Sequence, residues 1–218
     1  ANLVTLSVDT IATPIAGKYI EHPDVQIIDF TGSPKYGSYL EDTITKKLLY
    51  TETAGVNSVV VESVDNLSDS MRAIARATCL FSAQMCTSPQ VVYVPKEGID
   101  TTDGHVSFDE VAQTIVNEIE AIAQDPKVAS GIMGAIQGKV SLDVVADATD
   151  MAICEGLSIL RKSSPYEHPD FPDARTLTPL VIAANPEHKE MYSEERFGPV
   201  LFIVAAESGD SAAEDATE

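Results

Sequence analysis

The sequence is poor in basic residues: 14 Lys and Arg stand against 34 Asp and Glu, which gives a formal net charge of −20. A field of that sign repels nucleic-acid phosphates and anionic lipid headgroups, so we expect neither nucleic acid nor a membrane as a partner. No apolar run approaches the roughly 18 residues of a membrane span, and the first residues lack the pattern of a secretory signal. These absences predict a cytoplasmic protein.

Cysteine and histidine are also scarce. The chain has three cysteines and no CxxC pair, which argues against a disulfide framework and against a zinc site. Its four histidines are far apart and have no cysteine at ligand spacing, so the sequence predicts no metal site. The chain also lacks GxGxxG and GxxxxGK[ST], the two common nucleotide-binding fingerprints.

Apolar segments alternate between strand-like runs and helical patterns, which predicts an α/β fold with a largely parallel sheet. The expected strands cover residues 3–8, 25–30, 48–50, 59–61, 91–94, 180–183 and 200–205. The expected helices cover residues 11–19, 37–47, 66–81, 108–123 and 129–152, the last with a possible break at Gly138. Residues 207–218 hold five acids and no base, which predicts a disordered acidic tail.

The first candidate for chemistry is the turn Phe30-Thr31-Gly32-Ser33, which follows an expected strand and precedes an expected helix. Glycine lets the backbone approach a phosphate, and a helix N-terminus offers free N–H groups. The alternative interpretation is an ordinary strand–helix turn.

The second candidate is Cys86, in a loop between an expected helix and an expected strand. A loop thiol held between rigid elements can be an exposed nucleophile. Most single cysteines are instead small buried hydrophobic residues, and that interpretation suits Cys79 and Cys154, which lie within helical patterns.

Two acidic positions complete the set of candidates. Glu52 lies between apolar strand-like runs, a setting that suits a general base, although a solvated strand-edge residue is the alternative. Glu195 belongs to a charged loop, residues 194–199, that leads into an expected strand. Taken alone, that loop is unremarkable.

Together the four features resemble the NAD(P)-dependent aldehyde dehydrogenase superfamily. Residues 30–33, 52–55, 84–86 and 195–199 read Phe-Thr-Gly-Ser, Glu-Thr-Ala-Gly, Gln-Met-Cys and Glu-Arg-Phe-Gly-Pro, in the family's order, and Cys86 follows Glu52 by 34 residues. The resemblance implies a three-layer fold with helices on both faces of a largely parallel sheet, truncated at both ends. Residues 1–50 would end the dinucleotide-binding domain, and residues 51–206 would form most of the catalytic domain.

The resemblance also implies roles. Cys86 would attack the aldehyde to give a thiohemiacetal and then a thioester, and Glu52 would activate the water that hydrolyses it. The cofactor would be NAD or NADP, with Gly32 and Ser33 beside its pyrophosphate. Glu195 would hold the nicotinamide ribose, and Phe197 would pack beside the ring. A glutamate base favours hydrolysis to a free acid over transfer to coenzyme A.

Within the superfamily, the sequence is most similar to bacterial phenylacetate-degradation (PaaN-type) aldehyde dehydrogenases, through residues 21–33, 52–58 and 85–90. This implies aromatic-acid catabolism, an aldehyde from an opened ring as substrate, and a homo-oligomeric parent protein. Ala54, Val56 and the absence of an arginine soon after Cys86 depart from the common pattern. We expect the isolated chain to be inactive as a dehydrogenase. The alternative is a non-catalytic α/β module that serves assembly or binding.

Overall fold

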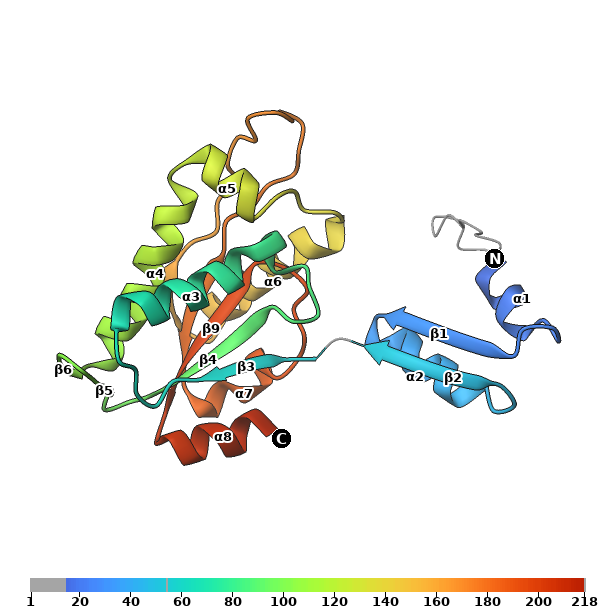
Figure 1. Ribbon diagram of the computed structural model, residues 1–218, viewed down its shortest axis with the longest axis horizontal. Coiled ribbons are helices and arrows are strands. Elements are labelled where there is room, and N and C mark those ends of the chain that lie inside the picture. The colour runs from blue at the N-terminus through green and yellow to red at the C-terminus, as the bar shows by residue number, and fades with distance from the viewer. Residues whose placement is uncertain (1–14, 54, 218) are drawn as a thin grey trace. The chain divides into compact units, whose positions relative to one another are not determined.

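The computed structural model describes residues 15–53 and 55–217, so the strand expected at residues 3–8 lies outside the described residues. The chain divides into two compact units between Ala54 and Gly55 (Figure 1). None of the described helices is long and apolar enough to cross a membrane.

The first unit is a βαβ arrangement. Strands β1 (Ile27–Gly32) and β2 (Leu48–Thr53) pair in parallel, and helix α2 (Pro34–Thr43) connects them; a short helix α1 (Ile15–Glu21) precedes them. Ser33 caps α2 by accepting a hydrogen bond from the Tyr36 N–H, and Pro34 occupies the first turn, where a missing N–H costs nothing. Leu40 of α2 is buried, so one face of this helix covers the strand pair.

The second unit is built on a five-stranded sheet. Its order is β3 (Asn57–Val60), β4 (Pro89–Pro95), β9 (Val200–Ala206), β8 (Leu180–Ala184) and β7 (Ser158–Arg161), and only β7 runs antiparallel to its neighbour. The central strands β4 and β9 are buried along almost their whole length. Buried parallel strands read as continuous apolar runs, which is why the sequence located both.

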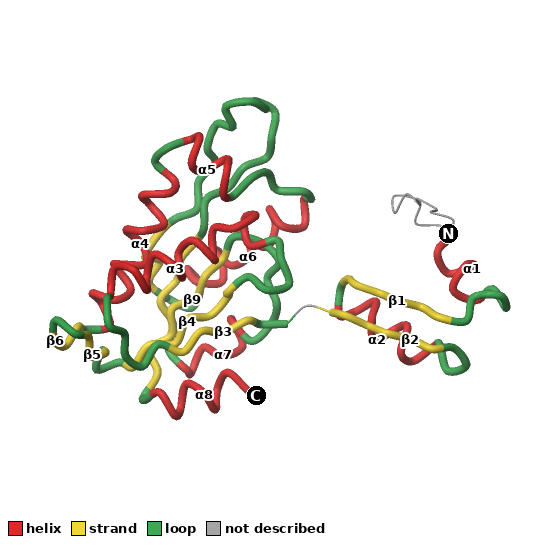
Figure 2. The backbone as a smooth tube through the Cα atoms, in the orientation of Figure 1, coloured by secondary structure: helices red, strands yellow, loops and turns green. Residues whose placement is uncertain are grey.

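Helices cover both faces of this sheet (Figure 2). Helices α3 (Leu67–Cys79), α4 (Phe108–Ala123) and α5 (Pro126–Ile132) pack on one face; α6 (Lys139–Cys154), α7 (Lys189–Tyr192) and α8 (Gly209–Thr217) pack on the other. Successive residues of β4 alternate between the faces, with Val92 and Val94 in the first core and Val91 and Tyr93 in the second. The expected three-layer α/β architecture is confirmed.

Local signals place several helix ends. Asn66 caps α3, Ser107 forms a capping box with Glu110 at α4, and Gly138 begins α6 where the expected break falls. Several short elements have no counterpart among the expected ones: strand β7, helix α7, the antiparallel strands β5 (Ile99–Thr101) and β6 (Gly104–Val106), and the 3₁₀ turn η2 (Pro186–His188). A further 3₁₀ turn, η1 (Leu80–Ala83), overlaps the end of the helix expected at residues 66–81. Strands of three residues are too short to show a period.

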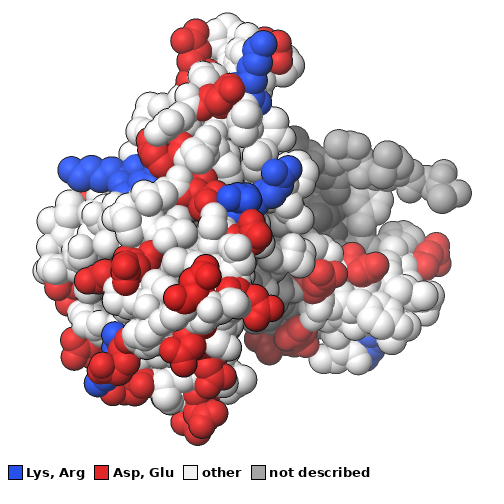
Figure 3. Space-filling model, turned by 60° about the vertical axis from the view of Figure 1, so that its left-hand side comes forward, with Lys and Arg blue, Asp and Glu red and all other residues white. Residues whose placement is uncertain are grey.

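The acidic C-terminal segment is helical as far as Thr217, contrary to the expected disorder. Ala212 of α8 is buried, the Tyr192 hydroxyl donates to Asp215 at 3.0 Å, and Lys189 forms an ion pair with Asp215 at 2.8 Å. Composition missed this helix because its anchoring partners lie on another element. On the face drawn in Figure 3, Asp and Glu side chains are scattered and outnumber those of Lys and Arg, in keeping with the net charge of −20.

Candidate active site

Cys86 is exposed, in a turn that directly precedes β4. The Ser88 N–H donates to the Met85 carbonyl at 3.1 Å and closes the turn. The Asn57 side-chain amide donates to the carbonyl of Cys86 at 2.6 Å. The turn is therefore held by its own backbone and by the first residue of β3, while the thiol remains accessible.

The chain reaches this turn through an unusual backbone segment. Phe81, Ser82 and Ala83 have φ values of 51°, 55° and 52°, and they are the only non-glycine residues with positive φ in the described part of the chain. Such conformations cost on the order of 1–3 kcal/mol each and persist only where the surroundings enforce them. The buried Ser82 hydroxyl donates to the Met133 carbonyl at 2.9 Å, which supplies part of that enforcement.

The other two cysteines differ from Cys86 and from each other. Cys79 is fully buried, and burial raises the pKa of its thiol to about 12, despite an opposing effect of Arg161. Cys154 is exposed, so the expectation that it is buried was wrong. The buried face of α6 runs through Ala148 and Ala152, and Cys154 lies off that face.

The loop of Glu195 is anchored to the same strand that follows Cys86. Gln90, buried in β4, donates to the carbonyls of Tyr192 at 3.2 Å and Glu194 at 2.8 Å, and it accepts from the Arg196 N–H at 2.6 Å. Glu195 is half-buried, and this burial raises the pKa of its carboxyl group.

A narrow pocket joins these two loops. Asn57, Met85, Ser88, Glu195 and Phe197 are among its lining residues. Because β3, β4 and β9 are parallel and all follow these segments, the pocket lies at the amino-terminal edge of the sheet. The structure thus brings Cys86, Glu195 and Phe197 to one edge of the second unit.

The remaining predicted residues gather in the first unit. Gly32 ends β1, where an added Cβ would lie 2.6 Å from the Phe30 ring, so only glycine fits without rearrangement. Ser33 is exposed at the N-terminus of α2. Glu52 is exposed in β2 and pairs in register with Thr31, so Gly32, Ser33 and Glu52 lie at the carboxyl ends of this strand pair. An open helix N-terminus after a parallel strand can bind a phosphate.

Two functional contacts were missed by the sequence analysis, those of Asn57 and Gln90. Gln90 directly precedes the apolar run of β4, and Asn57 is separated from the apolar run of β3 by Ser58 alone. That position is the one available signal, because their partners lie in the turn that contains Cys86 and in the 192–196 loop, far away in sequence.

Comparison with known proteins shows consistent similarity. Residues 2–217 match the family model of the aldehyde dehydrogenase family. The 4-trimethylaminobutyraldehyde dehydrogenase B of Danio rerio is 25% identical over 194 residues, covering 87% of this chain and 36% of that protein. The 2-aminomuconic 6-semialdehyde dehydrogenase of a Pseudomonas species is 27% identical over 201 residues, covering 88% and 38%.

A solved structure agrees with these relatives. The crystal structure of an NAD-dependent aldehyde dehydrogenase from Burkholderia multivorans has a TM-score of 0.86 and 38% identity, and the match covers 91% of this chain and 35% of that one. The chain therefore spans little more than a third of the length of these three proteins.

Proposed function

Because the chain belongs to the aldehyde dehydrogenase family, we propose that it supplies the nucleophile and the general base for NAD(P)-dependent oxidation of an aldehyde to a carboxylic acid. The observation that carries this proposal is the exposed Cys86, on a turn fixed by Asn57 and sharing a sheet edge with Glu195. Of the three cysteines, Cys79 is buried, and Cys154 lies at the end of α6, where it lines a different pocket with Glu155 and His188.

Cys86 performs the covalent step. Its thiolate adds to the carbonyl carbon of the aldehyde, the C=O double bond becomes a single bond, and the oxygen takes up a proton to give a thiohemiacetal. Loss of a hydride from that carbon, together with the hydroxyl proton, leaves a thioester on Cys86. The substrate carbon is thereby oxidised, and the sulfur stays bonded to it.

Glu52 performs the hydrolytic step. Its carboxylate accepts a proton from water as the water oxygen attacks the thioester carbon, and the C–S bond then breaks. The products are the carboxylic acid and the Cys86 thiolate. Water needs such a base, which favours hydrolysis over transfer to coenzyme A.

The first unit fits a dinucleotide. Gly32 leaves the backbone open where a side chain would clash with Phe30, and the exposed N-terminus of α2 at Ser33 suits a pyrophosphate. Glu195 would hold the nicotinamide ribose, and Phe197, which is 39% exposed, would pack beside the ring. When bound, the nicotinamide accepts the hydride from the substrate carbon.

The extent of the chain limits what it does alone. Since it spans 36% of the Danio rerio relative and 35% of the Burkholderia multivorans structure, the proposed activity belongs to a larger protein that contains this chain. We propose that this protein is homo-oligomeric and that the 218 residues by themselves turn over no aldehyde.

The proposed substrate is an aldehyde derived from an opened aromatic ring, in phenylacetate catabolism. The support is the pattern of residues 21–33, 52–58 and 85–90. One relative is named for 2-aminomuconic 6-semialdehyde, whereas others are named for different aldehydes, such as 4-trimethylaminobutyraldehyde.

The test is NAD(P)H formation with a panel of semialdehydes and aromatic aldehydes, using the larger protein. We expect Cys86→Ala to abolish turnover and the matched variant Cys154→Ala to retain it. Turnover that survives Cys86→Ala would overturn the proposal. A protein that lacks turnover with every aldehyde and instead associates through this chain would support the binding-module alternative.

A further inference from the structure

Two glutamines flank the turn at residues 85–88, which contains the candidate nucleophile Cys86, one on each side of the turn. The first, Gln84, donates from its side-chain nitrogen to the carbonyls of Phe81 at 2.9 Å and Ala135 at 3.1 Å. Its side-chain oxygen accepts from the Gln137 N–H at 2.9 Å. One amide therefore binds the segment before Cys86 to the loop between α5 and α6.

The second glutamine makes the same set of contacts on the other side of the turn. Gln90 is 5% exposed, donates to the carbonyls of Tyr192 and Glu194, and accepts from the Arg196 N–H. A glutamine side chain has two N–H donors and one oxygen acceptor. In both residues the two donors and the acceptor all form hydrogen bonds. These contacts also fix which way each amide faces.

The α5–α6 loop that Gln84 holds is itself anchored. The Arg175 guanidinium donates to the carbonyls of Ile136 at 3.2 Å and Gln137 at 2.6 Å, and the Tyr166 hydroxyl donates to the Gly134 carbonyl at 2.6 Å. The loop is itself hydrogen-bonded to the rest of the second unit. Gln84 therefore attaches the backbone before Cys86 to a fixed part of the structure.

We propose that Gln84 and Gln90 are positioning residues. Gln84 sets the position of the backbone before Cys86, and Gln90 holds the 192–196 loop, which contains Glu195, in a fixed position relative to that backbone. The proposal rests on the proposed function, which makes Cys86 the nucleophile and Glu195 a cofactor contact. Neither glutamine touches the reacting atoms. Each acts by fixing backbone that precedes or flanks such a residue: Gln84 bonds to Phe81 ahead of Cys86, and Gln90 bonds to Glu194 and Arg196 on either side of Glu195.

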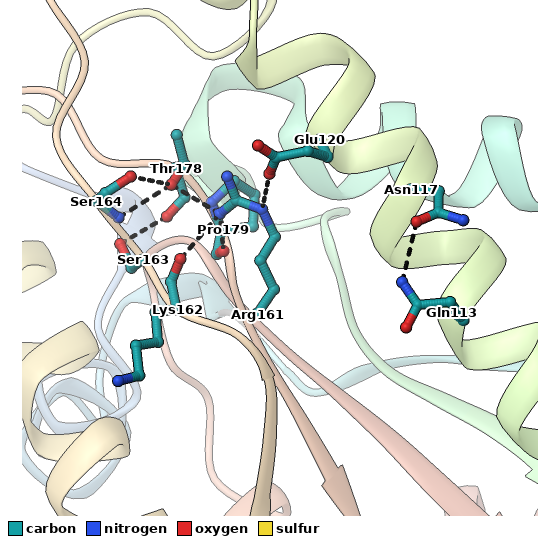
Figure 4. Close-up of polar contacts among 9 residues, drawn as sticks. All are labelled: Gln113, Asn117, Glu120, Arg161, Lys162, Ser163, Ser164, Thr178 and Pro179. Carbon is teal, nitrogen blue, oxygen red and sulfur yellow. Dashed lines mark hydrogen bonds and ion pairs between the residues drawn. The ribbon is translucent and has the colours of Figure 1, made fainter.

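The design of the variants follows from the contacts. Gln→Met keeps the length of the side chain and removes all three hydrogen bonds, so packing is nearly retained. In Gln90→Met the Arg196 N–H loses its acceptor, and in Gln84→Met the Gln137 N–H loses its acceptor. The matched control is Gln113→Met on α4, where the exposed glutamine side chain donates to the Asn117 side chain at 2.9 Å (Figure 4).

The experiment combines amide hydrogen exchange with alkylation of the 218-residue chain by iodoacetamide, read at each cysteine. We expect exchange at Arg196 to rise about tenfold in Gln90→Met and exchange at Gln137 to rise similarly in Gln84→Met. We also expect the rate of alkylation at Cys86, relative to that at Cys154 in the same molecule, to change at least about threefold in both variants. Gln113→Met should change neither quantity.

A purely structural role would lower the free energy of unfolding without altering the Cys86-to-Cys154 ratio, and that result would overturn the proposal. If Gln90→Met does not fold, Gln90→Glu replaces it, because a carboxylate keeps the acceptor and loses both donors. The proposed function fails separately, through aldehyde oxidation that survives Cys86→Ala.

Discussion

The side-chain amide of Asn57 donates a hydrogen bond to the carbonyl oxygen of Cys86 at 2.6 Å. Asn57 is the first residue of β3, and Cys86 lies just before β4, the parallel neighbour of β3. The bond therefore joins two strands at their amino ends and fixes the backbone of the candidate nucleophile from outside its own turn.

We expect Asn57→Ala to lower the free energy of unfolding by about 1 kcal/mol, because the carbonyl of Cys86 loses its donor. Urea denaturation measures the change. Asn117→Ala is the control, since Asn117 is an exposed residue of α4 whose side chain accepts a hydrogen bond from the neighbouring Gln113 side chain. Equal effects of the two substitutions would show that the bond to Cys86 contributes nothing of its own.

Cys79 makes the free energy of unfolding depend on pH in the alkaline range. Burial raises the pKa of its thiol from 9.0 to about 12, so the unfolded chain releases this proton at a lower pH than the folded chain does. Stability must then fall as pH rises through that window, by about 1.4 kcal/mol per pH unit for one such group. Denaturation at several pH values should show a shallower slope for Cys79→Ala and an unchanged slope for Cys154→Ala. Identical slopes for both variants would contradict this account.

Arg161 is the centre of a polar network at the antiparallel edge of the sheet (Figure 4). Its guanidinium pairs with Glu120 at 2.9 Å and donates to the Thr178 hydroxyl and the Pro179 carbonyl, each at 2.8 Å, while its side chain is 9% exposed. Removing it takes one donor from each of these acceptors, although the Thr178 hydroxyl keeps the Ser164 N–H and the Glu120 side chain is 46% exposed. We therefore expect Arg161→Met to cost about 2 kcal/mol in thermal or urea unfolding. The exposed neighbour Lys162 provides the control. A loss for Lys162→Met as large as that for Arg161→Met would contradict the importance of the network.

Asp215 anchors α8 in a pH-dependent way. Burial alone would raise the pKa of its carboxyl group, but hydrogen bonds from Lys189, Tyr93 and Tyr192 outweigh burial and hold that pKa below the ordinary value of 3.8. Its stabilisation is therefore present above pH 3.8 and is lost as pH falls through the lower, folded-state pKa. We expect Asp215→Asn to cost about 2 kcal/mol at neutral pH and progressively less in acid. Glu214→Gln, on the exposed side of α8, should cost little at either pH; a cost for Asp215→Asn that does not shrink in acid would refute the assignment.

Much of the fold could be predicted because it depends on local pattern. Continuous apolar runs located β4 and β9, and helical patterns of apolar residues located α3 and α4. The tail could not be predicted from composition, because Asp215 acquires Tyr192 and Lys189 as partners only after the chain has folded.

The candidate site was likewise predicted from the sequence only in part. The order and spacing of Glu52, Cys86 and Glu195 were sufficient to indicate the family, but the residues that hold the turn were not recognised. Asn57 and Gln90 bind backbone groups, and backbone groups leave no trace in the sequence. The prediction for Cys154 failed for a different reason. A helical pattern does not show how the helix is turned about its axis on the sheet, and this rotation decides which face is buried.

The most direct test of the central claim is a mass measurement on the Glu52→Gln variant of the larger protein, after mixing with NAD(P) and an oxidisable aldehyde. If Cys86 is the nucleophile and Glu52 the base of hydrolysis, one equivalent of NAD(P)H forms rapidly, and the acyl group accumulates as a thioester on the peptide that contains Cys86. Cys86→Ala should give neither signal. Normal turnover by Glu52→Gln, or an acyl group on any other residue, would contradict the account.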